Sequence, residues 1–114
     1  MTMLSRLLGG GRAAPSQTIG FDDLRRDLAA GKVALVDVRE PGEFRAGHVP
    51  GSLNMPLSAF DPGGLPRDRS VVLICLSGGR SGRALGFARR AGCEAVHFQG
   101  GVSLWKSLGG PFSA

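Results

Sequence analysis

Two continuous apolar runs dominate the hydrophobic pattern of the chain. Residues 33–36 are Val-Ala-Leu-Val, and residues 70–74 are Ser-Val-Val-Leu-Ile. Neither run alternates polar with apolar positions, so each predicts a strand that is covered on both faces, as in a parallel sheet. Shorter segments predict further strands over residues 17–19, 52–56 and 96–98.

Helical spacing fills the intervals between these strands. Phe21, Leu24 and Leu28 fall on one face of a helix predicted over residues 21–30. Further helices are predicted over residues 42–46, 82–91 and 102–108, and a loop over residues 61–66. Strands that alternate with helices indicate an α/β fold built from parallel βαβ units with right-handed crossovers.

The length of 114 residues suits one domain, which we expect over residues 17–114. Residues 1–16 carry two arginines and no acid, and a Gly-Gly-Gly run interrupts their apolar positions. This composition is typical of a transit peptide, but the segment is short for one. We therefore expect residues 1–16 to form a flexible N-terminal segment.

The composition also bears on location. No run approaches the roughly 20 apolar residues that span a bilayer, so we expect a soluble protein with no membrane partner. Two cysteines, Cys75 and Cys93, cannot form a disulfide framework or a zinc cage by themselves. With no secretion signal we expect both to be reduced thiols, which indicates a cytoplasmic location.

The net charge of +5 is carried almost wholly by arginine, because only Lys32 and Lys106 are lysines. Arginine suits the recognition of oxyanions, although a solvated basic surface explains the charge equally well. Nucleic acid is not an expected partner, since the chain has no tyrosine and no clustered aromatic and basic residues.

The candidate chemistry lies where the second apolar run ends, at Cys75. A cysteine in this position is often only a small buried hydrophobe. Here Gly78 and Gly79 allow backbone N–H groups to converge on an anion, Arg80 adds a positive charge, and Ser81 can cap the following helix. Such surroundings lower a cysteine pKa from about 8.5 to roughly 3.5–7.5, which indicates a nucleophilic thiolate.

Three segments together resemble the rhodanese-like sulfurtransferase family of single-domain proteins. Residues 75–81 match the active-site pattern C-x-x-G-x-R-S, and residues 37–51 are similar to D-V-R-x-x-x-E-[FY]-x-x-G-H-I-P-G. Residues 100–111 resemble the C-terminal pattern G-G-x-x-x-W-x-x-x-G-x-P. The three occur in the family's order and cover most of residues 17–112.

The resemblance implies a three-layer α/β/α fold with a five-stranded parallel sheet. It also implies that Cys75 carries a persulfide, taking sulfane sulfur from thiosulfate or a protein persulfide and passing it to an acceptor nucleophile. No metal or organic cofactor is implied. The implied substrate-binding residues are Leu76, Ser77, Gly78, Gly79, Arg80 and Ser81.

Two alternatives share the same fold. Cell-cycle dual-specificity phosphatases have five residues between cysteine and arginine, whereas residues 76–79 make only four here, a cradle that suits sulfur better than a phosphoryl group. No aspartate is identifiable as a general acid for a leaving alcohol. A sulfur-carrier or protein-binding module with little turnover is the other alternative.

The sequence leaves two possible roles for several other polar residues. Asp37 and Arg39 could lie behind the cysteine, because strand ends of a parallel sheet share one edge. With Glu43 and His48 they could instead form a structural network. Two further residues receive no catalytic role from the sequence: His97 is expected to be exposed or hydrogen-bonded, and Cys93 to be buried filler rather than a resolving thiol.

Overall fold

The computed structural model describes residues 17–114. The predicted flexible segment, residues 1–16, lies outside the described residues. The helices and strands are α1 (Phe21–Ala29), β1 (Val33–Asp37), α2 (Pro41–Ala46), β2 (Leu53–Asn54), β3 (Ser70–Ile74), α3 (Gly79–Arg90), β4 (Ala95–His97) and α4 (Gly101–Ser107). Two 3-10 turns, η1 (Leu57–Ala59) and η2 (Pro62–Gly64), lie in the connection between β2 and β3. Within the described range, no helix is both long and apolar enough to cross a bilayer.

The sheet is parallel throughout, with the strand order β2-β1-β3-β4. Its centre is the pairing of β1 with β3, in which all five residues of Val33–Asp37 align with Ser70–Ile74. Every residue of β1 is buried, and in β3 only Ser70 is exposed. The two continuous apolar runs of the sequence are therefore the two central strands, covered on both faces.

The prediction of five strands is wrong, because the sheet formed by residues 17–114 has four. The segment predicted as the first strand makes a single parallel bridge, between Thr18 and His97. His97 N donates to Gln17 O (2.9 Å), and Ile19 N donates to His97 O (3.2 Å). Gly20 is already the N-cap of α1. The chain thus turns into the helix before a strand can extend.

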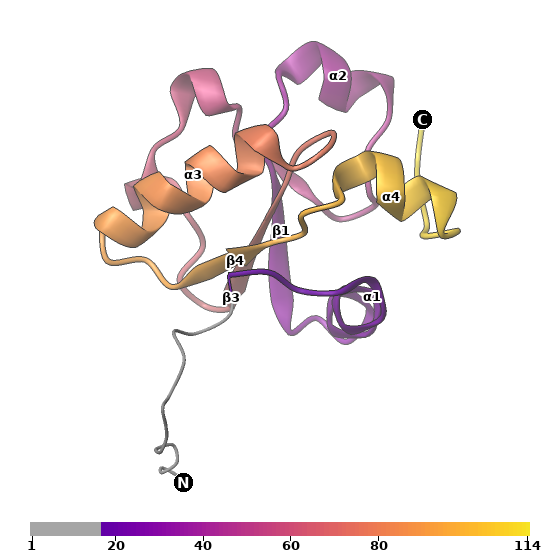
Figure 1. Ribbon diagram of the computed structural model, residues 1–114, viewed down its shortest axis with the longest axis horizontal. Coiled ribbons are helices and arrows are strands. Elements are labelled where there is room, and N and C mark those ends of the chain that lie inside the picture. The colour runs from indigo at the N-terminus through magenta and orange to yellow at the C-terminus, as the bar shows by residue number, and fades with distance from the viewer. Residues whose placement is uncertain (1–16) are drawn as a thin grey trace, which may run out of the picture.

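Helices cover both faces of the sheet (Figure 1). On one face, α3 packs over a cluster that contains Val71, Leu73 and Cys75. On the other face, α1 and α4 pack over a second cluster, which contains Val72, Ile74 and Trp105. Alternate residues of β3 thus enter different clusters, as a two-period strand requires. The α/β fold with a parallel sheet is confirmed.

The carboxyl ends of the strands meet at one edge of the sheet. There β1 leads into α2, β3 leads into α3, and β4 leads into α4. The register pairs Asp37 with Ile74, and Val38 N donates to Ile74 O (2.8 Å). Cys75 is the next residue of the chain. In open α/β sheets this edge is where ligands bind.

Candidate active site

Cys75 follows β3 directly, and its exposed fraction is 1%. The helix after it starts at Gly79, earlier than the predicted start at residue 82. The cause is Gly78, the N-cap, whose φ of 106° turns the chain sharply into the helix. The loop is therefore confined to residues 76–78, and Arg80 and Ser81 belong to the first turn of α3.

Hydrogen-bond donors converge on the sulfur of Cys75. The backbone N–H of Gly78 donates to Sγ at 3.1 Å, and Oγ of Ser81 lies 3.5 Å from it. Burial raises the pKa of the Cys75 thiol, but the Ser81 hydroxyl and the backbone N–H groups of Ser81, Gly78 and Ser77 outweigh it. The net result is a pKa below the ordinary value, as hydrogen bonds to a thiolate produce.

The first turn of α4 is hydrogen-bonded to the backbone of the cysteine loop. Val102 N donates to Cys75 O (2.8 Å), and Ser103 N donates to Leu76 O (3.1 Å). Gly101, the residue before Val102, has a φ of +68°. A Cβ atom there would lie 2.6 Å from Cys75 O and closer still to Leu76 O. Gly101 of the C-terminal motif therefore allows α4 to pack directly against the cysteine loop.

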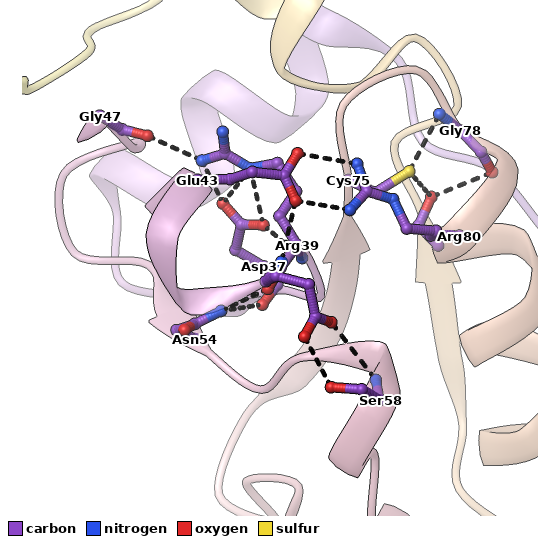
Figure 2. Close-up of polar contacts among 11 residues, drawn as sticks. Asp37, Arg39, Glu43, Gly47, Asn54, Ser58, Cys75, Gly78 and Arg80 are labelled. Carbon is purple, nitrogen blue, oxygen red and sulfur yellow. Dashed lines mark hydrogen bonds and ion pairs between the residues drawn. The ribbon is translucent and has the colours of Figure 1, made fainter. Parts of the chain in front are cut away.

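Arg80 binds Glu43 of α2 rather than pointing alone into solvent (Figure 2). Its two terminal nitrogens donate to the two carboxylate oxygens, at 2.6 and 3.0 Å. The hydrogen bond from Arg80 is the main cause that lowers the pKa of Glu43 from 4.5 to about 2. The bidentate pair fixes the first turn of α3 to α2 across the cysteine loop.

The Glu43→Gln substitution should lower the free energy of unfolding by about 1 kcal/mol at neutral pH, the upper range for a partly exposed pair. The pKa of Glu43 is lowered on folding, so the contribution of the pair is complete above pH 4.5 and is lost as the pH falls through about 2. Urea unfolding of both proteins between pH 7 and pH 3 measures this difference.

The control for that experiment is Glu94→Gln. Glu94 is exposed, and no ion pair holds it in the part of the chain that the structure describes. Its substitution should change stability little at either pH. A deficit in Glu43→Gln that stays constant down to pH 3 would contradict the assigned ion pair.

Asp37 and Arg39 bind each other in a buried pair. Nε of Arg39 donates to both carboxylate oxygens at 3.0 Å, and Nη2 donates to Oδ2 at 2.8 Å. Nη2 also donates to Gly47 O, and the Asn54 amide donates to the carbonyl oxygens of Asp37 and Arg39. These contacts join β1, β2 and the segment after α2 (Figure 2). Within the described residues, neither side chain is hydrogen-bonded to the sulfur of Cys75.

The predicted binding residues near the buried sulfur differ in how much of each is exposed to solvent. Leu76, Ser77 and Gly79 are exposed, Arg80 is partly exposed, and Gly78 and Ser81 are buried. The exposed fraction of Leu76 reaches 43% although it is a large apolar side chain. A ligand approaching from solvent therefore contacts the exposed loop residues before it can reach the buried thiol of Cys75.

The sequence profile described as the rhodanese-like domain matches residues 21–108. The chain belongs to the rhodanese-like family. This confirms the resemblance carried by the three motifs, whose residues line the edge of the sheet just described.

Relatives of known name include sulfurtransferases. The probable adenylyltransferase/sulfurtransferase MoeZ of Mycobacterium tuberculosis is 42% identical over 100 residues, which cover 82% of this chain. The chain spans only 26% of that relative's length. The thiosulfate:glutathione sulfurtransferase of Saccharomyces cerevisiae is 34% identical over 112 residues, covering 82% of this chain and 81% of the yeast protein.

A solved structure shares both fold and size with this rhodanese-like domain. The rhodanese-related protein from Thermoplasma volcanium superposes with a TM-score of 0.78 at 31% identity. The match covers 85% of this chain and 97% of that one.

His97 is the residue near the site that sequence reasoning missed. It is buried at the end of β4, and its Nδ1 lies 2.8 Å from Oγ of Ser81. The hydrogen-bonded alternative is thus what the structure shows. The alternation of side chains along β4 could have indicated this position, because Ala95 and His97 point to the same face of the sheet. In the structure His97 aligns with Leu73, two residues before Cys75.

Cys93 lies at the far end of α3 from Cys75. A helix of twelve residues separates them, about 18 Å at 1.5 Å per residue. A disulfide requires Cα atoms within about 7 Å, so Cys93 cannot resolve a persulfide on Cys75 of the same chain. Its Sγ is instead 3.7 Å from Pro62 O. Among residues 17–114, no three His, Cys, Asp or Glu side chains are grouped to hold a metal ion.

Proposed function

We propose that this rhodanese-like protein is a sulfurtransferase of the thiosulfate type, which moves sulfane sulfur through a persulfide on Cys75. One observation carries the proposal: Cys75 directly follows a central strand, its sulfur accepts a hydrogen bond from Gly78 N beside Ser81 Oγ, and its pKa is lowered. A thiolate in this position is a nucleophile at neutral pH. Homologues named as sulfurtransferases support a general sulfurtransferase activity.

The proposed reaction has two steps, each a displacement at sulfur. The Cys75 thiolate attacks the outer sulfur of thiosulfate, the S–S bond of thiosulfate breaks, and sulfite leaves with the electron pair. The product is a persulfide anion on Cys75. An acceptor such as cyanide then attacks the outer sulfur, the bond to Sγ breaks, and the thiolate of Cys75 is restored. No metal or organic cofactor takes part.

The loop residues 76–81 would bind the donor and the outer sulfur. Backbone N–H groups at the start of α3 offer hydrogen bonds to an anion, and the helix dipole favours negative charge there. Arg80 contributes its positive charge while it is held by Glu43, so it fixes the shape of the cradle rather than reaching out to a donor. A persulfide on another protein is a second donor of suitable chemistry.

The yeast relative named thiosulfate:glutathione sulfurtransferase supports thiosulfate as the donor class. Two free cysteines suit a reducing compartment, so a cytoplasmic location is part of the proposal. The short loop argues against the phosphatase alternative, because only residues 76–79 separate cysteine from arginine.

Parallel assays with thiosulfate plus cyanide and with an aryl phosphate separate the alternatives. We expect catalytic formation of thiocyanate and no hydrolysis of the phosphate ester, with Cys93→Ser behaving like the unsubstituted chain. Phosphate release at a comparable rate would indicate a cysteine phosphatase. A Cys75 persulfide that forms without repeated thiocyanate production would indicate a non-turnover sulfur carrier.

A further inference from the structure

His97 sits beside the cysteine loop with its side chain on the α3 side of the sheet. Its exposed fraction is 8%, and its backbone is hydrogen-bonded to Gln17 and Ile19 on one side of β4. Its neighbour in β3 is Leu73. The histidine is thus fixed in the sheet and cannot move far without breaking strand pairing.

Three buried side chains form a continuous hydrogen-bonded chain, in which His97 has no role in the proposed reaction. Sγ of Cys75 is 3.5 Å from Oγ of Ser81, and Oγ of Ser81 is 2.8 Å from Nδ1 of His97. The exposed fractions of Ser81 and Cys75 are 0% and 1%. We propose that His97 accepts the proton of the Cys75 thiol through the Ser81 hydroxyl, so that the three side chains act as a buried proton relay.

The relay conserves atoms and charge. The S–H bond of Cys75 breaks as the proton moves to Oγ of Ser81, while the original hydroxyl proton of Ser81 moves to Nδ1 of His97. The products are a thiolate, an intact hydroxyl and an imidazolium, with no net change in charge. Before transfer, Nδ1 carries the lone pair and the other ring nitrogen carries the hydrogen. Both hydrogen bonds survive with their direction reversed, so no side chain has to move.

In the described part of the chain, the Ser81 hydroxyl is hydrogen-bonded to the His97 ring and links it to Cys75. The described residues around the His97 side chain and strand position are Ser81 and Gly82 from α3, Leu73 from β3, and Thr18 on the other side. None of these four residues carries a titratable side chain. The guanidinium of Arg89 binds Ala95 O, at the opposite end of β4.

Burial disfavours an isolated charge on His97 as it does on Cys75. Desolvation lowers the pKa of His97, so an imidazolium there is disfavoured on its own. A thiolate reached through Ser81 offsets that cost, and the imidazolium in turn stabilises the thiolate. The two ionisations are therefore expected to titrate as a pair.

The test is a pH titration of the Cys75 thiolate by its ultraviolet absorbance in a Cys93→Ser background. The chain has no tyrosine, so no tyrosinate absorbs in the same region. His97→Asn keeps a hydrogen-bonding group near the Nδ1 position but cannot hold a proton. We expect its thiolate to appear at least about one pH unit higher, which is about tenfold less thiolate at neutral pH. Ser81→Ala interrupts the relay and should shift the titration in the same direction. Because it also removes the hydroxyl that lowers the Cys75 pKa directly, His97→Asn is the variant that decides.

Nuclear magnetic resonance supplies the reciprocal measurement. The chain has only two histidines, so the His97 imidazole is assigned by its loss in His97→Asn. Its pKa should fall in Cys75→Ala, where no thiolate can form. A His97→Asn protein that titrates like its parent would overturn the relay and leave His97 as a hydrogen-bonding partner only, as would an unchanged His97 pKa in Cys75→Ala.

The inference rests on the proposed role of Cys75 as nucleophile, but the two can fail separately. The thiolate titration requires no sulfur donor and no turnover. Coupled titrations without persulfide formation would therefore refute the sulfurtransferase proposal and uphold the relay. Persulfide formation with uncoupled titrations would do the reverse.

Discussion

Cys75→Ser is expected to abolish sulfur transfer, lowering the turnover rate from thiosulfate to cyanide by at least about 10³-fold. Serine can accept the hydrogen bond from Gly78 N that the sulfur now accepts. Its hydroxyl does not ionise near neutral pH, however, and it cannot form a persulfide. The substitution therefore removes the nucleophile while it leaves the loop's hydrogen-bonding pattern available.

The matched control is Cys93→Ser, which removes the other thiol at the far end of α3. This variant should retain full activity, because its sulfur contacts Pro62 and no residue of the cysteine loop in the described structure. Thermal melting followed by Trp105 fluorescence checks that both variants are folded. Activity retained by Cys75→Ser, or lost equally in Cys93→Ser, would contradict the assignment of the nucleophile.

Gly101→Ala is expected to destabilise the protein by about 3 kcal/mol, combining a left-handed backbone with a steric clash. The added methyl group would press on the carbonyl oxygens of Cys75 and Leu76, which are rigid backbone. For a domain of this size, the melting temperature should fall by roughly 10 °C or more. Because α4 must shift away from the cysteine loop, turnover should fall as well.

Substitutions at two other glycines separate the cost of the left-handed backbone from the cost of the steric clash. Gly109 has a φ of +80° but open space around its Cβ position, so Gly109→Ala should show only the backbone cost of about 1–2 kcal/mol. Gly79 has open space and no positive φ, so Gly79→Ala should leave stability nearly unchanged. A melting temperature for Gly101→Ala equal to that of Gly109→Ala would show that close packing against the loop is unimportant.

The fold was predictable where local pattern and burial agree. The apolar runs at residues 33–36 and 70–74 predicted the central strands because both faces of β1 and β3 are covered. The fifth strand failed because strand pairing depends on how far the chain stays extended before α1, which residues 17–19 alone do not reveal. The early start of α3 depends on the left-handed backbone of Gly78, a conformation that glycine permits but does not require.

In the candidate site, too, local features were predictable from the sequence and long-range contacts were not. The sequence placed Cys75 at the end of a strand, since a strand followed by a glycine loop and a helix is a local pattern. The pairing of Arg80 with Glu43 and of Ser81 with His97 joins residues 37 and 16 positions apart. Such contacts follow from the packing of α2 and β4 against α3, so spacing along the chain could not predict them.

The role of Cys75 as the sulfur-carrying nucleophile can be measured as the mass of the protein before and after incubation with thiosulfate, mapped to peptides that contain Cys75 or Cys93. It predicts a gain of one sulfur atom on Cys75, the loss of that sulfur when cyanide is added, and no gain in Cys75→Ser. A sulfur atom found on Cys93, or none on Cys75, would contradict it.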